Sequence, residues 1–222
     1  MNYKGIPFET ELIKHVELEK VLKEKGVPPS SNLGPTATYT YALPSIYDTS
    51  TGARVSESYR IAEYLDKAYP DTPKVIPPGT EVLQTAWVEA VMTNLNALWP
   101  FSMPGTLNLI VDSESREYFH RTRTIMFGKD LRELTPKGEA WDAAIKELEK
   151  SFNAIDQWML KSGGPYVMGD TPSFADFVLA GFLKWTEPSV GKDSKEWQLI
   201  TTWNEGRWVK RVEQLAKYEN PQ

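Results

Sequence analysis

The stretch PDTPKVIPPG, residues 70–79, divides this 222-residue chain into two parts with different sequence patterns. Its prolines and its lack of either helical or strand periodicity are typical of a linker. Before it, strand-like and helix-like segments alternate, whereas the apolar residues after it recur with helical spacing. We therefore predict a mixed α+β domain at residues 1–70, a linker at 71–80 and an all-helical domain at 81–222.

The first part contains four segments with a recognisable pattern. Residues 8–13 follow Pro7 with partial alternation and predict a strand. Residues 16–26 have helical spacing and end at a glycine. The segments at 45–48 and 53–56 flank TSTG and predict a β-hairpin, and a helix is expected to start near Ser56.

In the second part, helices are predicted wherever apolar residues return every three or four positions. These segments cover residues 81–99, 115–134, 139–160 and 174–185, with two more at 197–203 and 208–218.

The composition excludes several classes of function. The chain has no cysteine, so disulfides and protein-thiol nucleophiles are ruled out, and its two histidines cannot form a histidine metal cluster. The net charge of −5, without a basic block, argues against nucleic acid as a partner. No apolar run spans a bilayer and the N-terminus lacks the pattern of a secretory signal, so we expect a soluble cytoplasmic protein without a metal.

One series of residues indicates a binding site. Leu43-Pro44 precedes the hairpin, and a cis bond there would present the backbone of Leu43 to an extended peptide. Glu57 and Ser58 occupy the first turn of the following helix, where a ligand ammonium and a ligand carboxylate can each find a partner. Together they describe a site for an α-amino acid head followed by a peptide. Taken singly, Ser56 and Ser58 are more simply read as helix caps.

This series resembles the glutathione transferase family, on the residues LP at 43–44, SES at 56–58 and IAEYLDKAYP at 61–70. The resemblance implies a thioredoxin-like first domain, a helical second domain, a homodimer and glutathione as co-substrate or ligand. It implies that Leu43 and Pro44 hold the cysteinyl backbone of glutathione and that Glu57 and Ser58 hold its γ-glutamyl group. The stretches NYKGIPFETE and SESYRIAEYLDKAYPDTP look closest to the fungal etherase-related class, called FuA.

A second motif lies in GDTPSFADF. Ser173 and Asp176 have the spacing of a capping box ahead of an apolar helix. The family carries such a box in its helical domain, where it serves folding, so we expect a structural role for both residues.

In the family, the first domain opens with a strand, a loop bearing the catalytic serine, tyrosine or cysteine, and a helix that ends much like NYKG at residues 2–5. This chain begins at that last turn. We therefore expect the first strand, most of the first helix and the catalytic segment to be absent, the strands at 8–13 and 45–48 to expose edges, and the catalytic residue to be unassigned. Ser45, Tyr39 and Tyr41 lie near the proline, but a structural role is favoured for each.

Aromatic residues suggest where a second ligand binds. Pro100 and Pro104 are expected to break the helix and to hold a turn open at residues 99–103. The predicted hydrophobic pocket, where the family binds its aromatic substrates, contains Trp99, Phe101, Met103, Tyr118, Phe119 and Phe127. Two functions follow: conjugation of glutathione to aromatic electrophiles or cleavage of their ethers, and non-catalytic, ligandin-type binding of polyphenolic aromatics.

Overall fold

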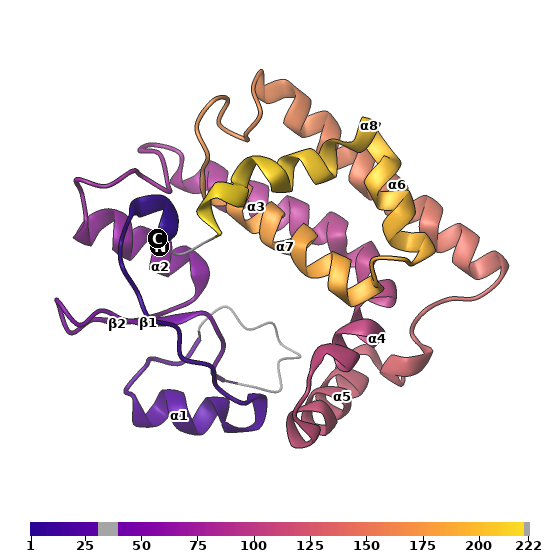
Figure 1. The fold of residues 1–222 in the computed structure, drawn as a ribbon, viewed down its shortest axis with the longest axis horizontal. Coiled ribbons are helices and arrows are strands. Elements are labelled where there is room, and N and C mark those ends of the chain that lie inside the picture. The colour runs from indigo at the N-terminus through magenta and orange to yellow at the C-terminus, as the bar shows by residue number, and fades with distance from the viewer. Residues whose placement is uncertain (31–39, 220–222) are drawn as a thin grey trace. The chain divides into compact units, whose positions relative to one another are not determined.

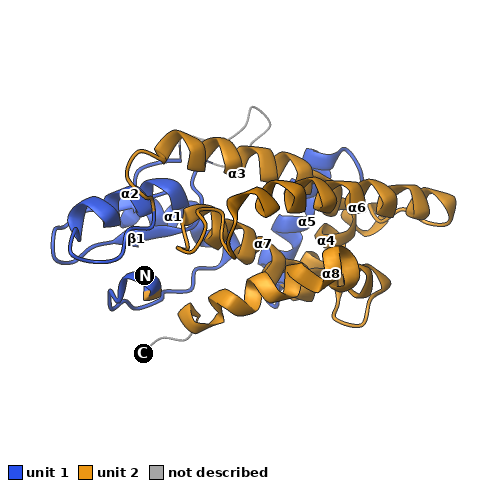
Figure 2. Cartoon of the chain, turned by 90° about the horizontal axis from the view of Figure 1, so that it is seen from above, with its two compact units in different colours: residues 1, 3–75, 110–130 blue, residues 2, 76–109, 131–222 orange. Residues whose placement is uncertain are grey.

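The structure is a computed structural model that describes residues 1–30 and 40–219 of the chain (Figure 1). Two compact units make up the chain (Figure 2): residues 1, 3–75 and 110–130 form unit 1, and residues 2, 76–109 and 131–222 form unit 2. No helix or strand is present in residues 70–80, around the point where unit 1 passes into unit 2. The domain boundary at 71–80 stays a prediction, because residues 110–130 cluster with unit 1.

Unit 1 contains two strands and three longer helices. They are α1 (Leu18–Glu24), β1 (Ser45–Tyr47), β2 (Arg54–Ser56), α2 (Ser58–Ala68) and α5 (Ser113–Phe127). The strands are antiparallel, with Ser45 opposite Ser56 and Tyr47 opposite Arg54. Gly52 takes a φ of 78° in the turn between them, a conformation that suits glycine. The predicted hairpin and the helices on either side of it are therefore confirmed.

The strand predicted at residues 8–13 is wrong. These residues belong to no strand, and among the described residues the only sheet is the pair β1–β2. The alternation in FETELI is a local signal, but a strand forms only where a neighbouring strand takes up its backbone donors and acceptors. Without such a neighbour, Phe8 and Leu12 are exposed to solvent.

Helix α5 is tied to the segment that precedes α1. The Asp112 side chain caps α5 by accepting from the Ser115 amide, and Gly128 ends the helix in a left-handed conformation. The His15 amide donates to Ser115 Oγ at 3.1 Å, and the imidazole stacks edge-on against the Phe119 ring at 5.7 Å. These contacts explain why a helix from the second half of the chain belongs to unit 1.

A buried ion pair between Lys4 and Asp66 holds α2 to the start of the chain. The side chain of Lys4 is fully buried, and its Nζ lies 2.6 Å from Asp66 Oδ1. Lys4 also donates to the Pro73 carbonyl at 2.9 Å, and both carboxylate oxygens of Asp66 accept from the Val75 amide. The pair thus connects the first turn of the chain with α2 and the segment after it.

Unit 2 consists of helices. They are α3 (Glu81–Leu95), α4 (Trp99–Leu109), α6 (Glu139–Met159), α7 (Phe174–Val190) and α8 (Lys195–Leu215). Within α8 the backbone leaves helical geometry at residues 203–206, so the two helices predicted for this region are present and meet at a kink. Within the described ranges, no helix combines the length and apolar character needed to cross a bilayer.

The open turn predicted at residues 99–103 is also wrong, because these residues begin helix α4. Pro100 stands in the first turn of the helix, where its missing amide costs nothing. Pro104 lies inside the helix and cannot donate to the Pro100 carbonyl, but Thr135 Oγ1 donates to that carbonyl at 2.9 Å instead. A side chain from outside the helix thereby replaces the hydrogen bond that Pro104 cannot make. The local sequence pattern around Pro104 gives no sign of this contact.

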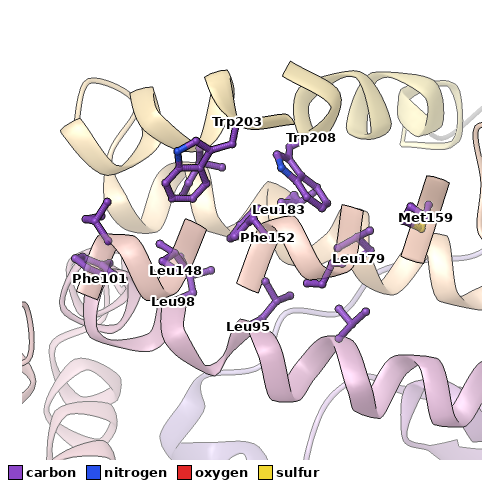
Figure 3. Packing of buried hydrophobic residues seen from close by; sticks show 14 residues of the cluster. Leu95, Leu98, Phe101, Leu148, Phe152, Met159, Leu179, Leu183, Trp203 and Trp208 are labelled. Atoms are coloured by element: carbon purple, nitrogen blue, oxygen red, sulfur yellow. The ribbon is translucent and has the colours of Figure 1, made fainter. Parts of the chain in front are cut away.

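The core of unit 2 lies among α3, α4, α6, α7 and α8 (Figure 3). Phe152 of α6 packs edge-on against two rings of α8, at 5.4 Å from Trp203 and 4.9 Å from Trp208. One turn further along the same face of α6, Arg207 donates to the buried Asp156 through Nε and Nη2. This bidentate pair attaches the segment after the α8 kink to α6.

Ser173 and Asp176 form a capping box at the start of α7. The Asp176 carboxylate accepts from the Ser173 amide at 2.9 Å and from the Val167 amide at 2.8 Å. Burial raises the pKa of Asp176, while these hydrogen bonds favour its charged form. The buried Gln84 of α3 adds a further cap, accepting from the Ala175 amide at 2.9 Å.

Candidate functional site

The Leu43–Pro44 bond is cis, as expected from the sequence. It lies just before β1, and Leu43 is exposed to solvent. Because the hairpin register places Ser56 opposite Ser45, the next residue along, Glu57, reaches back to the proline, and its amide donates to the Pro44 carbonyl at 3.2 Å. The hairpin therefore brings residues 43–44 and 57–58 together, although they are far apart in the sequence.

The start of α2 has an unusual backbone. Glu57 has a φ of 73° and a ψ of 125°, and Ser58 is the first residue of the helix. The first turn carries no acidic side chain, and Glu57 makes no capping hydrogen bond through its own side chain. The helix thus presents its amide groups, with the positive end of its dipole, beside an exposed serine hydroxyl.

Ser56 has a different role from Ser58. It is buried at the end of β2, and its hydroxyl donates to the Pro28 carbonyl at 3.2 Å. Ser56 is therefore a structural residue, whereas Ser58 stands at the surface where a ligand can reach it.

The hairpin turn is held to the far end of α2 by one carboxylate. Asp48 Oδ2 accepts from the hydroxyl of Tyr64 at 2.5 Å and from the hydroxyl of Tyr69 at 2.8 Å. The hydrogen bond from Tyr64 is the main reason that the pKa of Asp48 lies below its usual value. These contacts fix the hairpin relative to α2 and so keep the two halves of the candidate site in register.

The arrangement can recognise an α-amino acid head joined to an extended peptide. The Leu43 backbone can pair with a peptide strand, while the carboxylate of Glu57 suits an ammonium group and the Ser58 hydroxyl suits a carboxylate. In the part of the chain that the structure describes, no cluster of three or more histidine and acidic side chains could hold a metal ion.

The three residues weighed as substitute thiol activators have structural surroundings where they are described. The Ser45 hydroxyl donates to the Ala42 carbonyl at 3.1 Å. The Tyr41 ring lies 5.5 Å from Lys23 Nζ. Tyr39 lies outside the described residues.

The residues predicted to form a hydrophobic pocket are divided between the units. Trp99, Phe101 and Met103 lie on α4 in unit 2, and Tyr118, Phe119 and Phe127 lie on α5 in unit 1. Phe101, Met103 and Phe119 are buried, and Phe101 belongs to the core of unit 2. Trp99 is partly exposed and packs against Phe182 and Trp185, each at 5.6 Å.

The contacts of two charged residues of unit 1, Lys4 and Arg60, were not predicted from the sequence. Lys4 has no local signal, because its partner Asp66 is distant in the chain. Arg60 follows Glu57, the N-cap of α2, by three residues, and its Nη1 lies 3.9 Å from Glu57 Oε1. The two opposite charges are close together in the sequence, which was a signal for this contact.

Comparison with known proteins identifies the family. Residues 82–218 match the model of the glutathione S-transferase C-terminal domain. The chain is also 32% identical to the glutathione S-transferase-like protein ustS of Aspergillus flavus, over 84% of this chain and 70% of that protein. The chain belongs to the glutathione S-transferase family.

Solved structures of glutathione S-transferases share the fold. A glutathione S-transferase of Ceriporiopsis subvermispora, crystallised in complex with glutathione, has 38% identity and a TM-score of 0.90, covering 100% of this chain and 88% of its own. Glutathione transferase GSTFuA3 of Phanerochaete chrysosporium has 32% identity and a TM-score of 0.89, covering 100% and 87%. The predicted fold class, a small sheet with helices followed by a helical part, is confirmed.

Proposed function

We propose that this glutathione S-transferase binds glutathione between Leu43-Pro44 and the start of α2, and directs its thiol at aromatic electrophiles. The observation that carries the proposal is the hydrogen bond from the Glu57 amide to the Pro44 carbonyl, because it joins the two halves of the motif into one site. Support comes from the similar Ceriporiopsis enzyme that was crystallised with glutathione.

Each residue of the site would have a defined task. The backbone of Leu43 pairs with the cysteinyl residue of glutathione, Glu57 accepts from the γ-glutamyl ammonium, and Ser58 donates to the γ-glutamyl carboxylate. The amide groups in the first turn of α2 add positive potential for that carboxylate. Pro44 sets the direction of the chain and supplies the carbonyl that holds Glu57.

The reaction follows from the chemistry of the thiol. The glutathione thiol gives up its proton to water, its sulfur forms a bond to an electrophilic carbon, and the leaving group, a halide or an aryl oxide, takes the electrons of the bond that breaks. The likeness to GSTFuA3 of Phanerochaete supports the FuA class. Because the sequence resembles that etherase-related class, we extend the proposal to the cleavage of aromatic ethers. Because the chain has no cysteine, the sulfur must come from the ligand, and we assign none of its residues to thiol activation.

Ser58→Ala is expected to weaken glutathione binding by about 1–3 kcal/mol, since it removes a hydrogen bond to a charged group. Isothermal titration calorimetry measures the change directly. Ser151→Ala is the matched control, because Ser151 is a partly exposed helical serine whose hydroxyl donates to the Glu147 carbonyl of its own helix. An unmutated chain that binds no glutathione would refute the proposal.

Steady-state conjugation of an aryl halide tests turnover. The assay measures conjugate formation by this chain with and without glutathione. We expect turnover that depends on glutathione. Glutathione binding without turnover would instead favour the ligand-holding function, in which aromatic compounds bind and are not transformed.

A further inference from the structure

Glu57 and Arg60 form a pair of opposite charges at the N-terminus of α2, with Glu57 as the N-cap and Arg60 in the first turn. The guanidinium Nη1 lies 3.9 Å from Glu57 Oε1, at the long limit for an ion pair. The Arg60 side chain is 50% exposed, whereas that of Glu57 is 12% exposed. The anion is therefore held close to the protein, and the cation stands at the surface beside it.

This pair complements a zwitterion. An α-amino acid head carries an ammonium and a carboxylate on the same carbon, and Glu57 and Arg60 offer the two opposite charges side by side. The first turn of α2 adds no other acidic side chain, so a ligand carboxylate would meet the helix dipole and the guanidinium together. A bidentate fork to a carboxylate is the geometry that arginine provides best.

We propose that Arg60 binds the α-carboxylate of the γ-glutamyl group while Glu57 binds its ammonium, an inference that rests on the proposed function. Arg60 then selects for thiols with an intact zwitterionic head. The exchange of partners is easy, because a loose ion pair at the surface contributes little to stability and leaves the guanidinium available to a better acceptor. Ser58 shares the same carboxylate from the adjacent position.

The test measures dissociation constants by calorimetry for three ligands. They are glutathione, its analogue 4-aminobutanoyl-cysteinylglycine, which lacks the α-carboxylate, and glutaryl-cysteinylglycine, which lacks the α-ammonium. Arg60→Gln is expected to weaken glutathione about tenfold or more and to change the affinity for the carboxylate-free analogue by less than about twofold. Glu57→Gln is expected to weaken glutathione but not the ammonium-free analogue.

Two control variants separate recognition from general effects. Lys67→Gln removes the same charge from an exposed position near the other end of α2 and is expected to change the glutathione affinity by less than about twofold. Arg60→Lys keeps the charge but not the planar fork, so it is expected to recover only part of the lost affinity.

Three outcomes would overturn the inference. If Arg60→Gln weakens glutathione and the carboxylate-free analogue equally, Arg60 acts on the fold of α2 and not on the carboxylate. If Arg60→Gln has no effect while Ser58→Ala does, glutathione binds as proposed but without Arg60. If the unmutated chain binds no glutathione, the proposed function and this inference both fail.

Discussion

Gly105→Ala is expected to lower the free energy of unfolding by about 4 kcal/mol or more. Single substitutions cause a loss of this size only when they create a severe steric clash or a defect in the core. A Cβ on residue 105 would lie 1.5 Å from the Ser189 carbonyl oxygen and 2.6 Å from its carbon. Both are backbone atoms of α7, so relief requires the helices themselves to separate. Separation would also break the hydrogen bond from Thr106 Oγ1 to Ser189 Oγ, which is 3.1 Å long.

Urea unfolding followed by tryptophan fluorescence measures this change, because all eight tryptophans lie in unit 2. Gly181→Ala is the matched control. It is a helical glycine of α7 whose added Cβ would meet no atom within 4 Å. Alanine there is expected to stabilise the helix by about 0.5–1 kcal/mol. A Gly105→Ala protein with the unfolding midpoint of the unmutated chain would contradict the close approach of α4 to α7.

Sequence patterns predict those elements whose signal is local, and they fail where the deciding contact comes from elsewhere in the chain. Helical spacing located α3, α6 and α7 and both halves of α8, because each buries its own apolar stripe. It failed at residues 99–103, since the signal to break the helix was local and its compensation came from Thr135. It failed again at residues 8–13, where a strand depends on a neighbour rather than on its own residues.

The same distinction between local signals and distant contacts applies to the candidate site and its surroundings. Leu43, Pro44, Glu57 and Ser58 were predicted from the sequence as site residues because an ordered motif carries them, and the register of the hairpin explains how they come together. The Lys4–Asp66 pair could not be found in this way, since neither residue belongs to a periodic pattern that points to the other. The aromatic residues predicted to form a pocket show a further limit: composition does not distinguish a ring that lines a site from one that fills a core, as Phe101 does.

Lys4→Met is expected to lower the free energy of unfolding by about 3 kcal/mol, at the lower end of the range for removing one partner of a buried ion pair. The loss leaves the Asp66 carboxylate, whose side chain is only 11% exposed, without its cation. The Val75 amide still donates to both carboxylate oxygens, which limits the cost. Urea unfolding followed by far-ultraviolet circular dichroism gives the value.

We expect burial, and not the N–O distance, to set how much stability is lost when the lysine of an ion pair is replaced. Lys23 provides the comparison with Lys4. Lys23 lies 2.5 Å from Glu19, closer than Lys4 is to Asp66, but the two side chains are 55% and 54% exposed. Lys23→Met is therefore expected to change the free energy of unfolding far less than Lys4→Met does, since water already solvates both charges. Adding Asp66→Asn to Lys4→Met is expected to recover part of the loss, because the amide keeps an acceptor for Val75 without a buried charge. Equal costs for Lys4→Met and Lys23→Met would show that the Lys4–Asp66 pair is not buried in solution.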